Sequence, residues 1–344
     1  MAQVKAIKLV KKDKKEIPIF FATDDNYIPY LDVAIRSLIA NASKNYRYTI
    51  NILNTGIKEE NIELVKKNEQ ENVSINFRDI TEDIKPIKNK LKGLYHFSVE
   101  MYYRLFIENI FPQYDKVLYL DCDIVVVGDI SKLYNVNLED NWIGGVTERI
   151  IYNDEVFSKY VKVTTGVDPI NYINSGILLM NLKKLREVNL AEQFMYVLSK
   201  YNVDVIDPDQ AYINFLCRDK IKYLPNGWNK EPLPEEAEGG LNIIHYALYK
   251  KPWQYDDVIN VEYFWNYAKK SPFYAEIKAR KDAFTDEQKA KKEAANVAIV
   301  EHAKRVIASD NTFKKVLLDN GNVLEGLIFT NDGVFEKGTN RRMN

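Results

Sequence analysis

The sequence predicts an α/β fold in which helices cover both faces of a largely parallel sheet. Short apolar runs at residues 17–22, 48–53 and 73–77 have the length of buried strands. Between the first two runs, apolar residues in the segment 28–39 recur at helical spacing. Because strands that alternate with helices form parallel sheets buried on both faces, this order predicts a doubly covered sheet.

Later segments continue the same alternation of helices and strands. Further elements are expected as a helix at 59–69, a helix capped by Ser98 that carries Tyr102, Leu105 and Phe106, a strand at 117–127, a strand at 172–180, helices at 190–201 and 209–218, and a strand at 242–246. We find neither an internal repeat nor a low-complexity tract. The chain therefore reads as one α/β unit over most of its length.

Length and charge limit the classes of function. A chain of 344 residues fits one large domain with an appendage, or two domains. Its 46% hydrophobic and 28% charged residues are typical of a folded globular protein. Since 48 Lys and Arg balance 49 Asp and Glu, there is no overall basic field and we expect no nucleic-acid partner.

The cysteines and the N-terminal segment predict a cytoplasmic protein. Cys122 and Cys217 do not form a disulfide framework, and free thiols in apolar surroundings fit a reducing compartment. No run of about 18 apolar residues appears. Residues 1–16 are rich in Lys but lack the apolar core and cleavage site of a signal peptide, so we treat them as a lead into the first strand.

Composition changes after about residue 270, which divides the expected α/β domain (17–270) from an appendage (271–344). Residues 286–309 are rich in Lys and Ala and have the apolar spacing of one helix. Asn320-Gly321 and Asp332-Gly333 between short apolar runs predict a hairpin. Stability or partner contact is the expected role, with acceptor recognition as the alternative. The Lys-rich helix suits either peripheral membrane contact or a solvated face.

Two carboxylates inside an apolar run are the most informative local feature. Asp121 and Asp123 interrupt residues 116–129, which otherwise read as a buried strand. Because burying an unpaired charge costs several kcal/mol, this pair should have a strong cation partner. Divalent ions such as Mg²⁺ and Mn²⁺ prefer carboxylate oxygens. A metal site is the favoured interpretation, and turn capping is the alternative.

Other polar residues follow the ends of predicted strands, where ligands bind in open α/β sheets. Asp24, Asn26 and Tyr27 come after the first strand, and neither a Gly-x-Gly-x-x-Gly nor a P-loop motif is present. His245 follows a later strand and suits Mn²⁺ more than Mg²⁺ as a third ligand. Lys251 is a candidate cation for a phosphate. An ordinary core histidine and a solvated lysine are the structural alternatives.

Several further residues are candidates with plain structural alternatives. His96 and Arg104 flank the helix expected after Ser98, and Arg104 could make paired hydrogen bonds to a sugar or phosphate or form a salt bridge. The remaining candidates lie at a strand start and a helix start, where polar residues often act only as caps. These are Asn174, Asp209 and Gln210.

Taken together, seven ordered motifs resemble glycosyltransferase family 8 over roughly residues 17–255. They are Phe-Ala-Thr-Asp-Asp-Asn-Tyr (21–27), Tyr-Arg-Leu (103–105), Lys-Val-Leu-Tyr-Leu-Asp-Cys-Asp (116–123), Asn-Trp-Ile-Gly (141–144), Ile-Asn-Ser-Gly-Ile-Leu-Leu-Met-Asn-Leu (173–182), Asp-Gln (209–210) and His-Tyr-x-x-x-x-Lys-Pro-Trp (245–253). The resemblance implies a GT-A, Rossmann-like nucleotide-diphospho-sugar transferase fold. It also implies that glucose or galactose moves from a UDP-hexose to a glycan, glycolipid or glycoprotein acceptor with retention of configuration.

The same resemblance assigns roles to individual residues. It implies Mn²⁺ (or Mg²⁺) ligands Asp121, Asp123 and His245. It implies contacts to the base and ribose from Tyr27, Asp24, Asn26 and the backbone near Ala22, and contacts to the diphosphate from His96 and Lys251. Cys122 lies within the donor-binding motif. The donor sugar would be lined by the candidate catalytic residues Arg104, Asn174, Asp209 and Gln210.

Two positions depart from the family pattern, and the route to retention stays open. Glu148 stands where Asp is frequent, and Leu248 stands where Gly is frequent, so the closing loop at Leu248 could sit differently. Retention can arise through a covalent intermediate or through front-face attack guided by the leaving phosphate. Gln210 is the nearest candidate to the reacting carbon by resemblance. Because an amide is a poor nucleophile, we favour front-face attack.

Two other classes of function share part of this pattern. Haloacid-dehalogenase-like phosphohydrolases also place Asp-x-Asp after an apolar strand, but at the start of their fold, whereas here some 115 residues precede it. A non-catalytic nucleotide-sugar-binding protein would not need the intact acidic pair and His245. The sequence therefore favours a transferase.

Overall fold

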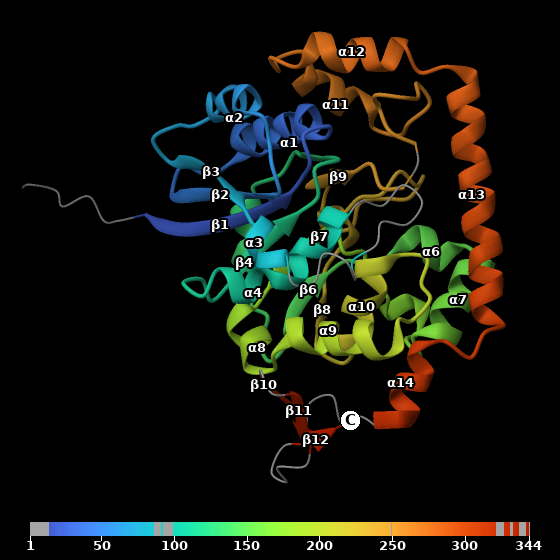
Figure 1. Cartoon of the computed structure of the whole chain (residues 1–344). Helices are drawn as coiled ribbons and strands as arrows, with labels where there is room; N and C mark the ends of the chain where they lie inside the picture. The colour runs from blue at the N-terminus through green and yellow to red at the C-terminus, as the bar shows by residue number, and fades with distance from the viewer. Residues whose placement is uncertain are drawn as a thin grey trace, which may run out of the picture.

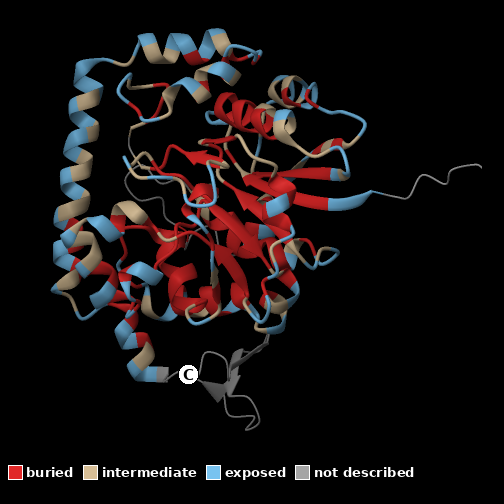
Figure 2. Ribbon diagram, turned by 180° about the vertical axis from the view of Figure 1, so that it is seen from behind, coloured by how far each residue is buried: buried red, intermediate tan, exposed pale blue. Residues whose placement is uncertain are grey.

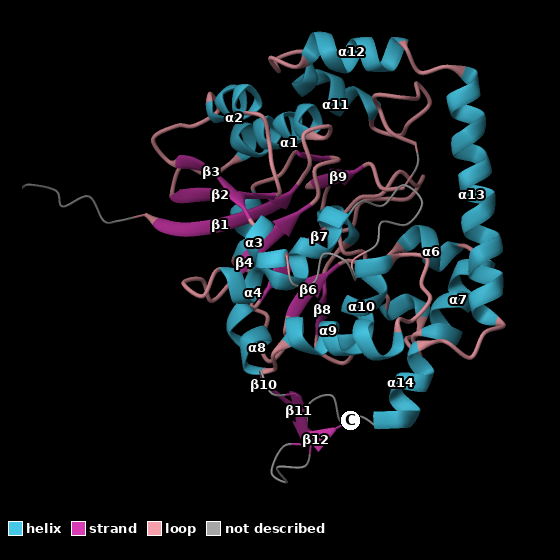
Figure 3. Cartoon of the chain, viewed as in Figure 1, coloured by secondary structure: helices cyan, strands magenta, loops and turns pink. Residues whose placement is uncertain are grey.

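The computed structural model describes residues 14–85, 91, 99–248, 250–320, 327–330, 333–336 and 342–343. At its centre is a seven-stranded sheet with the order β3-β2-β1-β4-β7-β6-β8 (Figures 1 and 3). The strands are β1 (Lys15–Ala22), β2 (Tyr46–Asn54), β3 (Val73–Asp79), β4 (Val117–Leu120), β6 (Ile143–Gly145), β7 (Ile177–Met180) and β8 (Ile221–Tyr223). All run in one direction except β7, which is antiparallel to both neighbours. The expected α/β fold is confirmed, with a mixed rather than purely parallel sheet.

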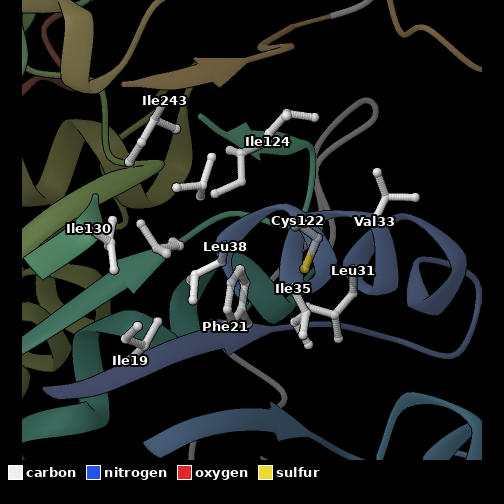
Figure 4. Close-up of a cluster of buried hydrophobic side chains, with 14 of the residues drawn as sticks. Ile19, Phe21, Leu31, Val33, Ile35, Leu38, Cys122, Ile124, Ile130 and Ile243 are labelled. Atoms are coloured by element: carbon white, nitrogen blue, oxygen red, sulfur yellow. The ribbon is translucent and has the colours of Figure 1, made fainter. Parts of the chain in front are cut away.

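Helices cover both faces of this sheet because its strands are apolar on both sides. Ile19 and Phe21 of β1 share a core with α1 (Ile28–Asn41), which contributes Leu31, Ile35 and Leu38 (Figure 4). The same core includes α11 (Val261–Ala268) and α12 (Tyr274–Asp282). Phe20 points to the opposite face, as alternation along a strand requires.

The opposite face is covered by a second group of helices. These are the 3₁₀ helix η1 (Val99–Phe106), α4 (Ile107–Ile110), α8 (Leu182–Glu187), α9 (Leu190–Tyr201) and α10 (Pro208–Leu216). Strands β4, β6 and β7 are buried throughout, whereas the peripheral helices carry exposed faces (Figure 2). The bounds predicted for α9 match the structure. The helix expected after Ser98 is instead a 3₁₀ segment followed by a short α-helix, and Ser98 itself lies outside the described residues.

The strand expected at 117–127 is broken at the two aspartates. β4 ends at Leu120, and β5 (Ile124–Val126) pairs instead with β9 (Ile243–His245) in a separate two-stranded sheet. The strand expected at 172–180 also starts late, because Ile177 is its first residue and residues 174–176 form a loop. Both breaks release polar side chains from the sheet at the same edge, where the end of β4 meets the start of β7.

The remaining helices of the α/β region are short. They are α2 (Glu59–Lys66), α3 (Thr81–Ile84), α5 (Ile130–Tyr134), α6 (Arg149–Asn153), α7 (Glu155–Thr164), η2 (Pro169–Asn171) and η3 (Asn226–Trp228). Of these, α6 and α7 matter most for the cleft described below, since they form one of its walls together with the C-terminal helix α13.

The long helix α13 (Asp286–Ile307) runs along one side of the molecule, from α12 to α14 (Phe313–Asn320), beside α7 (Figure 1). Thr285 begins it with a capping box that includes Gln288. Its Ala303 and Val306 are buried in a small core with Tyr160 and Val161 of α7. Packing against α7 therefore holds α13 in place.

The predicted C-terminal hairpin is present. β10 (Leu327–Thr330) pairs antiparallel with β11 (Gly333–Glu336), and β11 pairs with β12 (Arg342–Met343). Asn320, expected in a hairpin turn, is instead the last residue of α14, and Gly321 and Asp332 lie outside the described residues. Among the helices that the structure describes, none combines the length and apolar character needed to cross a lipid bilayer.

Candidate functional site

A cleft of about 780 Å³ opens at the sheet edge where β1 and β4 end and β7 begins. Because β7 runs against β4, its first residues lie beside the residues that follow β4, and the Asp121 amide donates to the Gly176 carbonyl at 2.7 Å. The predicted site residues that line this cleft are Ala22, Asp24, Asn26, Tyr27, Arg104, Asp121, Cys122, Asp123, Asn174, Asp209, Gln210, His245 and Lys251. His96 lies outside the described residues.

Asp121, Asp123 and His245 form a compact group of candidate metal ligands. One ligand atom from each lies within 4.8 Å of the others, and His245 Nε2 is 3.3 Å from Asp123 Oδ1 and 3.9 Å from Asp121 Oδ2. The β5–β9 pairing produces this arrangement by setting Ile124 opposite His245. Two carboxylates and one imidazole are a donor set that suits Mn²⁺.

Gly176 keeps space open beside these ligands. A Cβ atom at this position would lie 2.4 Å from His245 Cε1 and 2.7 Å from Asp121 Oδ2, both far inside van der Waals contact. Only glycine therefore fits while the two ligands keep their places. The residues present fit a small divalent ion.

A chain of hydrogen bonds sets the protonation of the His245 ring. The Gly176 amide donates to Asn174 Oδ1 at 2.9 Å, which identifies that atom as the acceptor. Asn229 Nδ2 donates to the same oxygen at 2.9 Å, so Asn229 Oδ1 faces His245 Nδ1, also at 2.9 Å. His245 Nδ1 must then carry the proton, and Nε2 presents its lone pair toward the aspartates, as in a metal-binding histidine.

Lys251 compensates the charge of Asp123. Its Nζ lies 2.5 Å from Asp123 Oδ2 and donates to the Tyr246 carbonyl at 2.6 Å. Burial by itself would raise the pKa of Asp123, but the charge of Lys251 and its hydrogen bond to the carboxylate lower it well below its usual range. Asp123 is therefore ionised, as a candidate metal ligand must be.

Arg104 is a buried link between two carboxylates. Its guanidinium lies over the Tyr119 ring at 4.2 Å, and it contacts Asp121 Oδ1 at 2.8 Å and Asp209 Oδ2 at 3.1 Å. The Arg104 guanidinium also donates a hydrogen bond to the Ser175 carbonyl. The salt bridge that the sequence allowed is present, and it is buried rather than on the surface. The contact of Arg104 with a sugar or phosphate stays a prediction.

Asp209 and Gln210 converge on the loop before β7. Ser175 Oγ donates to Asp209 Oδ2 at 2.9 Å, and the Ser175 amide donates to Gln210 Oε1 at 2.9 Å. Burial raises the pKa of Asp209, while Arg104 opposes that shift. The α10 start thus does more than cap a helix, because it fixes the loop that carries Asn174.

The buried carboxylate of Asp207 contacts the Gln210 side chain. Asp207 accepts from Tyr172 Oη at 2.5 Å, from Tyr160 Oη at 3.0 Å and from Gln210 Nε2 at 3.3 Å. Burial raises its pKa to about 7 despite these donors. Both ends of the Gln210 amide are therefore held by the protein.

The end of the cleft formed by Asp24, Asn26 and Tyr27 is exposed, and its hydrogen bonds join residues that are close in sequence. Asp24 Oδ1 accepts from the Tyr27 amide at 3.0 Å, and Asp24 Oδ2 accepts from Asn26 Nδ2 at 3.0 Å. The Tyr27 side chain is 38% exposed and meets the Trp253 ring edge to face at 6.1 Å. This turn presents an aromatic ring and polar groups toward the cleft.

The two departures from the family pattern have clear structural settings. Glu148 is buried, accepts from Asn174 Nδ2 at 2.6 Å and caps α6 through the Ile150 amide at 3.2 Å. Leu248 lines the cleft and has φ of +61°. It therefore keeps the left-handed backbone that favours glycine, even though the side chain has changed.

Sequence reasoning missed Asn229, the contribution of Ser175, and Lys292. Asn229 directly follows η3 and precedes Lys230 and Glu231, and no local pattern distinguishes it from them. Lys292 belongs to α13 and lines the cleft with Asn296, Ile299 and Val300. The helical spacing of these four residues was a usable signal, but only the tertiary arrangement shows what they face.

The comparisons with known proteins agree with this geometry. The sequence matches the family described as Glycosyl transferase family 8 over residues 18–257. It is 28% identical to a lipopolysaccharide 1,2-glucosyltransferase of Escherichia coli over 287 residues, covering 77% of this chain and 81% of that protein.

Solved structures show the same fold. The galactosyltransferase LgtC, determined in complex with donor and acceptor sugar analogues, superposes with a TM-score of 0.62 at 26% identity and covers 74% of this chain and 96% of LgtC. The bifunctional glycosyltransferase WbbM gives a TM-score of 0.68 at 25% identity and covers 81% of this chain, which spans only 53% of that longer protein. The fold is GT-A, and the chain belongs to glycosyltransferase family 8.

Proposed function

We propose that the protein is a retaining hexosyltransferase that moves glucose or galactose from a UDP-sugar to a glycan, glycolipid or glycoprotein acceptor in the cytoplasm, with Mn²⁺ as its metal. The observation that carries this proposal is the group formed by Asp121, Asp123 and His245 at the base of the cleft. In this proposal residues 17–270 are the catalytic domain and 271–344 are its appendage.

The exposed end of the cleft suits the nucleoside. Tyr27 offers a ring for stacking on uracil, while Asp24, Asn26 and the backbone at Ala22 would contact the base and ribose. The turn is held by its own hydrogen bonds, so it is formed before the donor arrives.

The buried end suits the diphosphate. Asp121, Asp123 and His245 would hold Mn²⁺, which when bound would neutralise charge that builds on the departing UDP. Lys251 would contact the same phosphates, since its Nζ already lies beside Asp123. His96 remains a proposed diphosphate contact from the family resemblance.

The contacts of Gln210 favour front-face attack over a covalent intermediate. Its Oε1 accepts from the Ser175 amide, and its Nε2 points to Asp207, so the amide is oriented by the protein. We propose that Gln210 and Asn174 orient the donor sugar. Arg104 and Asp209 would act as positioning residues, because their charged groups contact each other and the metal ligand Asp121.

The test is metal-stimulated release of UDP from UDP-glucose and UDP-galactose, measured with wild type, Asp123→Ala and the control Asp256→Ala. Asp256 is an exposed acid that pairs with Lys281 away from the ligands. We expect Asp123→Ala to lose at least a hundredfold in rate, because a ligand of the reacting complex is removed, while the control keeps the wild-type rate.

Unchanged metal-stimulated activity in Asp123→Ala would overturn the proposal. Rapid release of phosphate from simple phosphoesters would instead indicate a hydrolase. Binding of UDP-sugars without turnover, across a broad panel of acceptors, would indicate a binding protein. Circular dichroism would establish that each variant is folded.

A further inference from the structure

One face of α13 changes its surroundings along its length. Ala303 and Val306 are buried against α7, whereas residues one to three turns earlier on the same face line the cleft. Those cleft-lining residues are Lys292, Asn296, Ile299 and Val300. The helix is therefore anchored at one end and forms a wall of the cleft at the other.

Lys292 reaches toward the turn that carries Lys251. Its Nζ donates to Gln254 Oε1 at 2.7 Å, and the backbone N–H of Gln254 donates to the Lys251 carbonyl at 2.9 Å. Burial and the charge of Lys251 lower the pKa of Lys292 to about 8. Two cations thus face one cleft, an arrangement that an anionic ligand would stabilise.

The net charge of the ion pairs around the candidate metal ligands is compatible with a further cation at the diphosphate. Among the described residues, this network joins three carboxylates to two cations, namely Asp121, Asp123 and Asp209 with Arg104 and Lys251. A divalent ion would give the network a small positive charge, and the two negative charges of a diphosphate diester exceed it. The departing nucleoside diphosphate carries still more negative charge.

We propose that Lys292, presented by α13, is a second cation for the diphosphate of the nucleotide-sugar donor, beside Lys251 in the same cleft. This inference rests on the proposed function. It gives the C-terminal region a direct part in donor binding, beyond a role in stability or acceptor contact.

The neighbouring residue provides a matched control. Lys291 is 74% exposed and pairs with Glu287 one turn earlier on the helix, at 2.8 Å. Lys292→Met and Lys291→Met thus remove the same charge from adjacent positions of one helix. Lys292→Arg keeps the charge at the cleft.

The experiment is calorimetric titration of UDP into each protein with saturating Mn²⁺, with uridine as a ligand that lacks phosphate. We expect Lys292→Met to weaken UDP binding about tenfold, since it removes one charged contact. Lys291→Met and Lys292→Arg should stay within about twofold of wild type, and uridine binding should be the same in all four proteins. Thermal unfolding verifies that the variants are folded.

Equal UDP affinity in Lys292→Met and wild type would overturn this inference and leave the proposed function intact. A raised KM for the acceptor with an unchanged KM for the donor would also overturn it, because Lys292 would then belong to the acceptor side. Failure of the wild-type protein to bind UDP with Mn²⁺ would overturn both proposals together.

Discussion

The two ends of the cleft are built in different ways. One end holds the candidate metal ligands Asp121 and Asp123 and is called the metal end here. Its contacts join residues distant in sequence, such as Arg104 with Asp121, 17 positions apart, and Lys251 with Asp123, 128 positions apart. At the Tyr27 end, the hydrogen bonds of Asp24 span only two or three residues. The first set is largely buried and mutually dependent, whereas the second is a surface turn held mainly by its own hydrogen bonds, with Arg280 as a distant donor to the Asn26 carbonyl.

This difference indicates where binding and stability are coupled. A buried ionic network fixes its members before any ligand arrives, but the loss of one member leaves others charged and unpaired. A local turn loses only its own contact when a side chain is changed. Variants at the metal end should therefore affect folding and metal binding together, and variants at the Tyr27 end should affect mainly ligand binding.

The largest expected effect comes from Arg104→Ala. Removing this guanidinium leaves the buried Asp209 and the partly buried Asp121 without this cation, so we expect the free energy of unfolding to fall by about 3–5 kcal/mol. Urea denaturation of the metal-free protein measures this change. The matched control is Arg280→Ala, because Arg280 donates to the Asn26 carbonyl at 2.6 Å and pairs with the exposed Glu276 at the other end. A similar loss in both variants would contradict the contrast between the two ends.

The next effect depends on pH and involves Asp207. Its folded pKa of about 7 lies above its ordinary value of 3.8, so between these values the folded chain holds a proton that the unfolded chain has released. Stability should therefore fall as pH rises through this window, by up to about 4 kcal/mol from this group. Asp207→Asn should remove that contribution, as seen by denaturation at pH 5 and pH 8. An identical pH dependence in wild type and variant would refute the assignment.

A smaller effect is expected from Asn229→Ala, which breaks the chain of hydrogen bonds that sets the His245 tautomer. Mn²⁺ affinity measured by calorimetry should fall about 10- to 100-fold, the usual effect of losing a partner of a metal ligand. Asn229→Asp keeps an acceptor for His245 Nδ1 and should fall between wild type and Asn229→Ala. Wild-type affinity in Asn229→Ala would show that the tautomer is set by other groups.

The smallest effect is expected at the exposed end. Tyr27→Ala should weaken UDP binding by about fivefold to tenfold through loss of base stacking. The free energy of unfolding should fall much less than in Arg104→Ala, by about 1 kcal/mol, since this ring is 38% exposed and loses only its contacts with Tyr30 and Trp253. Tyr27→Phe keeps the ring and should bind UDP as wild type does. A large loss of stability in Tyr27→Ala would remove the distinction between the two ends.

Much of the fold could be predicted because its signals are local. The strand that ends at Ala22, the helix that begins at Ile28 and the helix at Leu190–Tyr201 each follow from apolar spacing within one segment. The reversed direction of β7 could not, because apolar residues in a four-residue strand do not record its direction. That reversal places Gly176 next to Asp121.

The candidate site divides along the same line. Asp121 and Asp123 stand out because charge in an apolar run is costly, a property visible in the sequence itself. Asn229 and Lys292 are ordinary polar residues until the chain folds, and only their distant partners give them significance. The role of Arg104 as a link between carboxylates was likewise invisible without Asp209 beside it.

Cys122 gives the cleft a built-in chemical reporter. It lies between the two aspartates, donates its thiol to the Ala22 carbonyl at 3.3 Å and is only 6% exposed. Burial and the adjacent carboxylates raise its pKa, so alkylation must wait for an opening motion. Cys217, fully enclosed in the other core, serves as the internal reference in the same chain. The rate of Cys122 labelling, measured by mass spectrometry with and without UDP and Mn²⁺, would report how often the segment after β4 opens.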